Sequence, residues 1–263
     1  GITCNCGRKF NSTSRWRRLE SRKEIIKILN QEKIDFREQA VNKFIELVLS
    51  MLVDAEGLKV RIKSNLKQLR RGELDALTIQ MFNFRMQTNL RVAEFQLDIG
   101  AAAVNMQSII RRKIELLHTS EGKLRIAIFQ EQLTTALNSE LTNLFNDKQH
   151  KIQFQQVSCD LRTEGAIAFH FNWISAEKIE SGTCITTPQI EPNNNAIVLI
   201  KQNFAGQEPP TEFVNQAIAQ VNNILSLNDL AHRGTSFNIQ QIEIAAGKVT
   251  VQANANIEQF PSP

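Results

Sequence analysis

The sequence predicts an α+β protein, in which a long, curved antiparallel sheet is wrapped around amphipathic helices. Two observations lead to this fold class. Segments with period-two hydrophobicity follow one another with short links, and segments with helical periodicity interrupt this series. Short links favour antiparallel pairing, because a parallel pair needs a crossover of about a dozen residues or more. With 263 residues, 42% of them hydrophobic, the chain is long enough for a substantial core.

Helical periodicity comes first, over residues 20–53. Apolar residues recur at the spacing of one helical face, with a break expected near Asn30–Asp35, so the region is predicted to form one or two helices. The segment that contains Phe44 and Val48 is strongly amphipathic, and we expect it to be buried beneath the sheet or in an interface. An interfacial membrane helix is the alternative, although the polar face of this segment is not rich in Lys or Arg.

Strands follow this helical region. Leu58, Val60 and Ile62 alternate with basic residues, which predicts a half-buried strand with a basic outer face. In the next strand the apolar positions change phase by one residue, from Leu77, Ile79 and Met81 to Phe82, Phe84 and Met86. Such a slip predicts a β-bulge or a sharp coil of the strand. Alternation at 90–99 and at 124–128 predicts further strands.

The second half of the chain repeats this succession. An apolar stripe at 133–145 predicts a helix, and alternation predicts strands at 152–154 and 167–173. Pro188, Pro192 and Asn193–Asn195 predict a turn region that leads to a strand at 196–202. A third helix is expected at 213–225, and a closing hairpin is expected from 237–244 and 249–257.

The composition argues against an enzyme, a cofactor and a metal site. Tyrosine is absent, and the phosphate-loop, dinucleotide, nucleophile-elbow and zinc-helix motifs are missing. The four histidines lie far apart in the sequence, at His118, His150, His170 and His232. We interpret His170 as part of the polar face of a strand and the others as surface residues, with His118 and His232 in turns. Glu73 and Asp75 could serve a hydrolase as an acid pair, but a solvated strand start is the simpler interpretation.

The net charge of +4 hides a polarised chain. Residues 1–149 carry 25 Lys or Arg and 17 Asp or Glu, whereas residues 150–263 carry 6 and 10. Basic clusters suggest an anionic surface as the partner. The candidate contacts are Lys59, Arg61, Lys63, Lys67, Arg70, Arg71, Arg111, Arg112 and Lys113. Aromatic side chains for base stacking are missing beside them, which argues against nucleic acid, and a solvated basic face is the alternative.

Residues 1–19 are interpreted as a basic tail that precedes a single domain at 20–263. Residues 1–18 contain five basic residues, no acidic residue and several hydroxyl side chains, which is the composition of a transit peptide or of the region after its cleavage site. A basic tail without a targeting role is the alternative. Cys4 and Cys6 have the wrong spacing for a redox or zinc pair, and Cys159 and Cys184 are interpreted as structural.

Bulky, adaptable apolar side chains recur on the predicted strands and could line a lipid-sized groove. Together with the helical residues Phe44 and Val48, the candidates are Phe82, Phe84, Met86, Phe95, Leu97, Phe169, Phe171 and Trp173. An ordinary core between the sheet and the helices is the alternative.

Several segments resemble the LmeA-like lipid-binding family of cyanobacteria, plastids and actinobacteria. They are, in order, Gly57–Ile62, Gly72–Ile79, Leu90–Val92, Ala103–Asn105, Ala136–Ser139, Gly247–Ala255 and Gln259–Pro261. The resemblance covers about residues 40–261 and implies a tubular lipid-binding (TULIP-like) fold that binds phospholipid or another acyl lipid without catalysis. Gln80, Met81 and Phe82 stand where family members usually have glycines, and Met106 stands where proline is common, so larger side chains fill part of the implied groove.

We therefore expect a non-catalytic lipid-binding or lipid-carrying protein that needs no cofactor and is peripheral to a plastid (chloroplast, thylakoid) membrane. Its expected partners are a phospholipid or glycolipid and the membrane surface, with the basic residues near 59–71 or 111–113 facing anionic headgroups. The alternative is a structural or assembly subunit of a membrane protein complex, which keeps the fold and binds protein.

Overall fold

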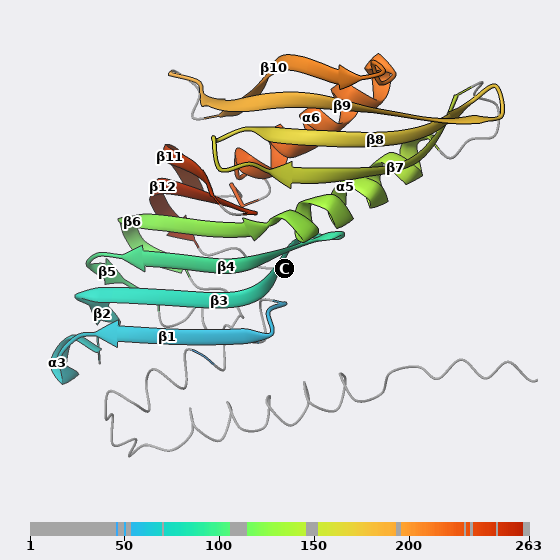
Figure 1. Cartoon of the computed structure of the whole chain (residues 1–263). Helices are drawn as coiled ribbons and strands as arrows, with labels where there is room; N and C mark the ends of the chain where they lie inside the picture. The colour runs from blue at the N-terminus through green and yellow to red at the C-terminus, as the bar shows by residue number, and fades with distance from the viewer. Residues whose placement is uncertain are drawn as a thin grey trace, which may run out of the picture.

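The computed structural model describes residues 46, 50, 54–69, 71–105, 115–145, 152–192, 196–228, 230–231, 234–245 and 247–259. These residues form a six-stranded and a four-stranded antiparallel sheet, with the helices α5 (Gln130–Phe145) and α6 (Thr211–Leu225) (Figure 1). Shorter elements are the helix α3 (Leu66–Leu69) and the paired strands β2 (Glu73–Leu74) and β5 (Ala102–Ala103). The expected α+β class with a large antiparallel sheet is confirmed.

The larger sheet has six strands, each antiparallel to its neighbours. In spatial order they are β1 (Gly57–Lys63), β3 (Ala76–Gln87), β4 (Leu90–Ile99), β6 (Glu115–Phe129), β12 (Lys248–Gln259) and β11 (Thr235–Ala245). The strand β12 pairs with β6 along most of its length, so the closing hairpin of the chain completes a sheet that the first half began. That hairpin is the one expected from the sequence.

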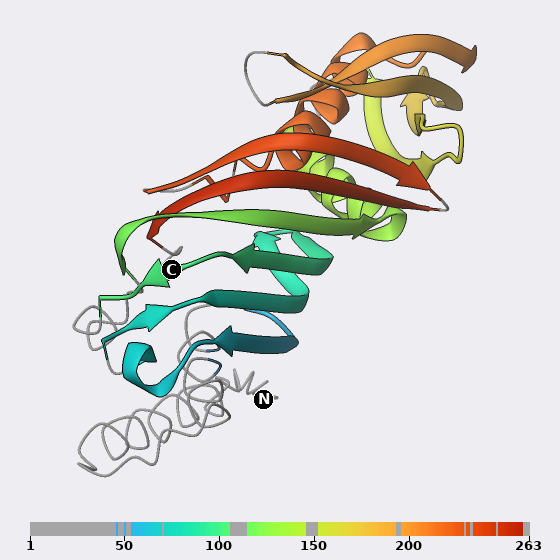
Figure 2. The same cartoon turned by 90° about the vertical axis from the view of Figure 1, so that its left-hand side faces the viewer.

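The smaller sheet is an antiparallel meander whose four strands lie, in the sequence, between the two long helices. Its spatial order is β10 (Ile197–Gly206), β9 (Lys178–Ile190), β8 (Ile167–Ser175) and β7 (Ile152–Leu161). The helix α5 leads from β6 into this sheet, and α6 leads from β10 back to β11. The helices contact each other, and α5 also contacts β4, β6 and β7. Figures 1 and 2 show both helices between the two sheets.

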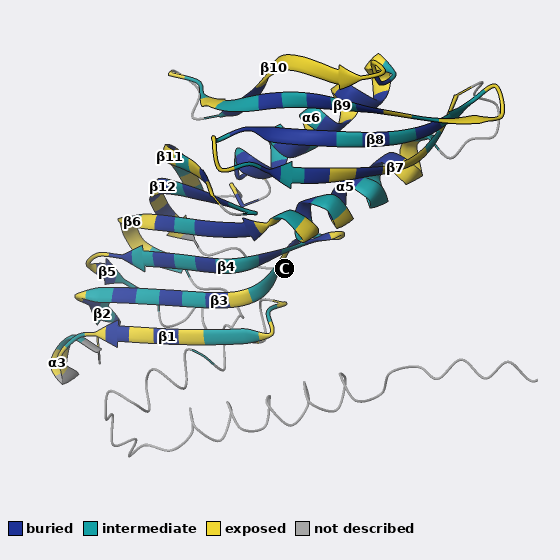
Figure 3. Ribbon diagram, in the orientation of Figure 1, coloured by how far each residue is buried: buried dark blue, intermediate teal, exposed yellow. Residues whose placement is uncertain are grey.

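The inner face of the larger sheet, which is turned toward the core, is apolar across all six strands. One complete row of registered side chains is Val60, Ile79, Leu97, Leu124, Ala253 and Ile239, each at most 5% exposed. The next row is Leu58, Met81, Phe95, Ile126, Val251 and Ile242. Because side chains alternate between the faces of a strand, polar residues occupy the outer face, as the alternating burial along β3 and β4 in Figure 3 shows.

The phase slip expected in β3 occurs at Asn83. Met81 is buried, Phe82 is 39% exposed, and burial resumes toward Met86. Asn83 lies between them with a φ of 48°, a left-handed conformation in a strand that is otherwise extended. This one residue changes the face to which the following side chains point, so Phe84 packs against the core, and the register with β4 shifts only between Arg85 and Gln87.

Helix side chains cover edge strands through hydrogen bonds to the backbone. From α5, the oxygens of Gln130, Thr134 and Asn138 accept the backbone N–H groups of Leu161, Cys159 and Val157, at 2.9, 3.0 and 2.8 Å. From α6, Asn222 and Ser226 accept those of Leu199 and Ile197, both at 2.9 Å. Glu46, which is also helical, accepts the N–H of Val60 at 2.9 Å. The edges β7, β10 and β1 are therefore held by helices.

Two expectations from the sequence are wrong. Pro188 belongs to β9, opposite Leu199, and not to a turn. The strand was not visible because its fully buried positions include a glycine and a threonine, Gly182 and Thr186, which leave no apolar alternation. Proline costs no ladder bond at 188, because β8 begins opposite Thr186. His118 lies exposed in β6, also not in a turn.

Candidate functional site

The apolar candidates on the larger sheet lie together on its inner face. Phe95 and Leu97 belong to the two rows described above and are 7% and 5% exposed. The rings of Phe84 and Phe95 are 5.5 Å apart and tilted by 58°. Met86 is buried in the same core, three residues beyond Asn83 in β3. These four side chains form one wall of the interior.

A second wall comes from the smaller sheet. Phe169, Phe171 and Trp173 alternate along β8 and are fully buried, at most 2% exposed. The Trp173 indole N–H donates to the Glu180 carboxylate at 2.8 Å, so the one polar atom of this large side chain has a partner. The helix α5 contacts both sheets and belongs to the same core. The structure therefore places seven of the apolar candidates in one interior, on two different sheets.

Phe82 lies on the other side of the sheet. It is opposite Gly57 in β1, and the Lys59 ammonium nitrogen is 5.5 Å from the centroid of its ring. The strand β3 therefore presents Phe82 and Phe84 to opposite faces. The remaining apolar candidates, Phe44 and Val48, lie outside the described residues.

Three further phenylalanines meet where α5 ends and α6 begins. The sequence analysis did not predict this cluster. The ring of Phe213 in α6 is 4.8 Å from that of Phe145 in α5 and 5.5 Å from that of Phe154 in β7, both in edge-to-face geometry. Phe145 and Phe154 are only partly buried, whereas Phe213 is 3% exposed. The sequence shows each ring at the apolar stripe of its own element, but not that the three stripes converge.

The basic candidates of β1 form an exposed stripe on the outer face of the sheet. Lys59, Arg61 and Lys63 are all exposed and alternate with the buried Val60 and Ile62. The expected half-buried strand with a basic outer face is therefore confirmed. Lys67 and Arg71 are exposed nearby in the sequence. The structure does not describe Arg70, Arg111, Arg112 or Lys113.

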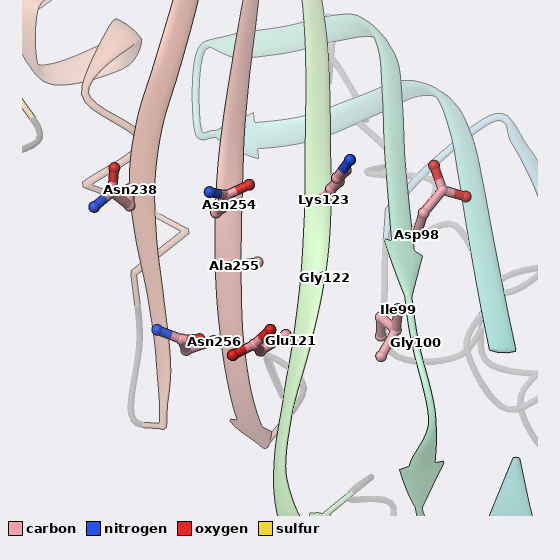
Figure 4. Close-up of a pocket in the computed structure, with 10 residues that line it drawn as sticks. All are labelled: Asp98, Ile99, Gly100, Glu121, Gly122, Lys123, Asn238, Asn254, Ala255 and Asn256. Carbon is pink, nitrogen blue, oxygen red and sulfur yellow. The ribbon is translucent and has the colours of Figure 1, made fainter. Parts of the chain in front are cut away.

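A hollow of about 540 Å³ lies on the outer face of the larger sheet. Figure 4 shows Asn238, Asn254, Lys123 and Asp98 side by side on four neighbouring strands, with Asn256 and Glu121 in the next row. Asp98 already accepts hydrogen bonds from Thr78 and Gln96, both at 2.7 Å. The side chains that project here are amides and charges of both signs, so this hollow suits a polar solute and offers nothing to an acyl chain.

A second hollow, of about 430 Å³, lies between the β3–β4 hairpin and α5. The described residues that line it are all polar: Asn83, Arg85, Thr88, Asn89, Arg91, Glu131, Gln132, Thr135 and Ser139. The two arginines were not among the basic candidates from the sequence. They would be recognisable only from the hairpin register, because Arg85 and Arg91 are six residues apart and directly opposite each other.

Among the described residues, the titratable side chains that are buried are two thiols. Burial raises the pKa of Cys159 from 9.0 to about 12, and burial also raises that of Cys184, against the lowering effect of Lys201. Both thiols are free and buried, as expected for structural cysteines. His170 is half-buried on β8, with Nδ1 2.8 Å from the Thr183 hydroxyl. Across the described part of the chain, no three His, Cys, Asp or Glu side chains come together as metal ligands.

Comparison with known proteins identifies one relationship. A family model described as LmeA-like phospholipid-binding matches residues 36–254, which is most of the chain. No curated protein and no solved structure gives a match. The matched range contains both sheets, except the last residues of β12, and both long helices.

Proposed function

The chain belongs to the LmeA-like phospholipid-binding family, and from this membership we propose that it is a non-catalytic lipid-binding or lipid-carrying protein that buries acyl chains in its apolar interior. The family supports a lipid as the partner. The phospholipid is the first choice among lipids, with a glycolipid as the second. The position of the acyl chains is part of the proposal.

The observation that carries this proposal is the inner face of the larger sheet. Two complete apolar rows cross all six strands without a polar side chain between them. Burial of a methylene group stabilises a complex by about 0.8 kcal/mol, so about ten buried methylenes provide roughly 8 kcal/mol. Apolar burial is therefore a large favourable contribution to binding, and it has to exceed the cost of association and of ordering the acyl chain.

Adaptable side chains at the hairpin support an entry point there. Met81 and Met86 lie on either side of Asn83 in β3, and methionine repacks easily around an irregular ligand. Phe84 is only partly buried beside them. The interior is thus bordered by flexible or partly exposed side chains near this hairpin, whereas the central rows are closely packed.

Peripheral attachment to a plastid membrane belongs to the same proposal. The exposed stripe of Lys59, Arg61 and Lys63 supports contact with anionic headgroups, since each basic residue near such a surface contributes about 1 kcal/mol. The basic, hydroxyl-rich composition of residues 1–18 supports import into an organelle. No helix within the described ranges is long and apolar enough to cross a membrane.

Native mass spectrometry of the purified full chain, followed by lipid extraction, tests the proposal. A stoichiometric phospholipid is the expected result. Phe84→Ser should reduce the bound lipid several-fold, because it places a hydroxyl at the border of the interior. Phe82→Ser is the matched control, since this ring lies on the opposite face of the same strand. A lipid-free protein that co-purifies with a membrane complex would instead favour a structural or assembly subunit.

A further inference from the structure

The hollow between the β3–β4 hairpin and α5 contains an unfavourable pair of charges. Arg85 and Arg91 are directly opposite each other in the register of β3 and β4. Like charges at such positions destabilise a sheet. One carboxylate, Asp54, lies between them: its Oδ2 is 2.9 Å from Arg85 Nε and its Oδ1 is 2.9 Å from Arg91 Nη2. On the strand side of the hollow, two cations therefore share one anion.

The geometry leaves hydrogen-bond donors free for a ligand. Arg85 contacts Asp54 through Nε, so within the described residues its two terminal nitrogens have no protein partner. Arg91 is held more firmly, because its Nη1 also donates to the Asn83 carbonyl at 2.8 Å. Thr88 and Asn89, at the hairpin turn, add a hydroxyl and an amide to the lining. Guanidinium and hydroxyl donors that converge in this way are the groups that bind phosphate oxygens.

The helix side of the hollow has the opposite character. Glu131, Thr135 and Ser139 occupy successive turns of α5 on one stripe. The Thr135 hydroxyl donates to the Glu131 carbonyl at 2.8 Å, which leaves its oxygen free to accept. The Glu131 carboxylate is exposed and has no protein partner within the described residues. With Asp54 included, the site holds two guanidinium groups and two carboxylates, so its charge is balanced.

The hollow lies near the same end of β3 as the partly buried border of the interior. Phe84 and Arg85 are consecutive residues of β3, and the first packs against the core while the second lines the hollow. The hairpin tip is also linked to α6, since the Gln220 amide donates to Gln87 at 3.2 Å. Phe84 and Arg85 both lie near the hairpin end of β3, and a ligand with its charged end in the hollow would extend its apolar chains around this end to reach the interior, because consecutive side chains of a strand point to opposite faces.

We propose that this hollow binds the headgroup of a zwitterionic phospholipid, with Arg85 and Arg91 on the phosphate and Glu131 on the ammonium. Asp54 is a positioning residue that holds the two guanidinium groups side by side. This inference rests on the proposed lipid-binding function and adds the class of headgroup. A balanced site favours a headgroup with a phosphate and an ammonium over an anionic one, because the latter would bring an uncompensated charge.

Competitive native mass spectrometry tests the headgroup assignment. The delipidated full chain is offered dioleoyl phosphatidylethanolamine, dioleoyl phosphatidylglycerol and dioleoylglycerol at equal concentrations. The doubly substituted Arg85→Gln, Arg91→Gln protein should bind both phospholipids about tenfold more weakly and dioleoylglycerol unchanged, since a charge-assisted hydrogen bond is lost. Glu131→Gln should reduce only the preference for phosphatidylethanolamine over phosphatidylglycerol. Arg125→Gln is the control, because Arg125 pairs with Glu94 at 3.2 Å on the same sheet and is similarly exposed.

Two further measurements keep the proposal falsifiable. Ser139→Phe fills the hollow without removing a charge and should weaken phospholipid binding in the same way, even if the double variant does not fold. Soluble glycerophosphoethanolamine and inorganic phosphate are titrated separately by NMR. If the wild type retains no lipid, the proposed function fails, but binding of glycerophosphoethanolamine at the hollow would still support this site. Equal loss of dioleoylglycerol and phospholipid in a folded variant, or unchanged phospholipid binding, would overturn it.

Discussion

At the scale of single residues, burial of a thiol links stability to alkaline pH. Cys159 is 2% exposed on β7, and burial raises its pKa from 9.0 to about 12. Below pH 9 the thiol is protonated in both the folded and the unfolded chain, so it does not favour unfolding. Above pH 9 the unfolded chain loses this proton first, and the free energy of unfolding falls as the pH rises toward 12.

We predict that Cys159→Ala flattens this dependence. The wild-type free energy of unfolding should fall by up to about 1.4 kcal/mol per pH unit from this group between pH 9 and 10.5. Urea unfolding in the presence of a reductant measures the slope. The chain has no tyrosine, which removes one common source of titration in this range. Cys184→Ala serves as the comparison and should flatten the curve less, because Lys201 opposes its pKa shift. An unchanged slope in Cys159→Ala would contradict the argument.

Gly182 is a residue whose missing side chain is required. A Cβ atom there would lie 1.8 Å from the backbone oxygen of Gln207 and 3.2 Å from Pro209 Cδ. We predict that Gly182→Ala lowers the free energy of unfolding by about 3 kcal/mol, because the backbone itself has to move. In Gly100→Ala the nearest atom would be 3.7 Å away, so thermal unfolding of this control should be nearly unchanged. Similar effects from both variants would show that packing at Gly182 is not the cause.

At the scale of elements, helix and strand geometry match at the edges of the smaller sheet. Gln130, Thr134 and Asn138 are four residues apart in α5, which is about 6 Å along a helix. Their partners, Leu161, Cys159 and Val157, are two residues apart in β7, which is about 6.7 Å along a strand. One helix stripe can therefore bind successive outward N–H groups of an edge strand. This covers an edge that would otherwise be open to pairing with another chain.

We predict that Asn138→Ala lowers the free energy of unfolding by about 2 kcal/mol. Its amide makes two contacts with the same residue of β7: it accepts from the Val157 N–H at 2.8 Å and donates to the Val157 carbonyl at 2.6 Å. Both backbone groups would lose their partner. Asn143→Ala, an exposed asparagine of the same helix, is the control and should cost under 0.5 kcal/mol. Hydrogen exchange of the Val157 amide should also accelerate in Asn138→Ala only.

The contrast between β8 and β9 explains how far the sequence predicts these elements. In β8 the buried positions include Phe169, Phe171 and Trp173, so hydrophobic periodicity reveals the strand. In β9 they include Gly182 and Thr186, and periodicity is lost. The apolar stripe of α5 predicted the helix, but the partners of Gln130, Thr134 and Asn138 depend on where β7 lies. The hollow was not predictable for the same reason, because Asp54 meets the two arginines only through tertiary contacts.

At the scale of the whole molecule, the uneven charge of the sequence becomes a difference between regions of the fold. The strand β1, at one edge of the larger sheet, exposes three cations, Lys59, Arg61 and Lys63, for which the described residues offer no ion pair. The residues from 150 onward, which contain the smaller sheet, have 6 basic and 10 acidic residues. An anionic surface should therefore attract the molecule by the β1 edge and not by the smaller sheet.

This orientation leads to the last prediction. The triple charge reversal Lys59→Glu, Arg61→Glu, Lys63→Glu should abolish most binding to vesicles that contain anionic lipid, because each lost cation weakens attraction by about 1 kcal/mol and each new anion repels. Co-sedimentation at 0.05 and 0.5 M salt measures it, and the difference from wild type should shrink at high salt. The reversal of Lys178, Lys201 and Lys248 changes the net charge equally but lies elsewhere in the fold. Equal loss in both triple variants would mean that net charge, and not the β1 edge, directs binding.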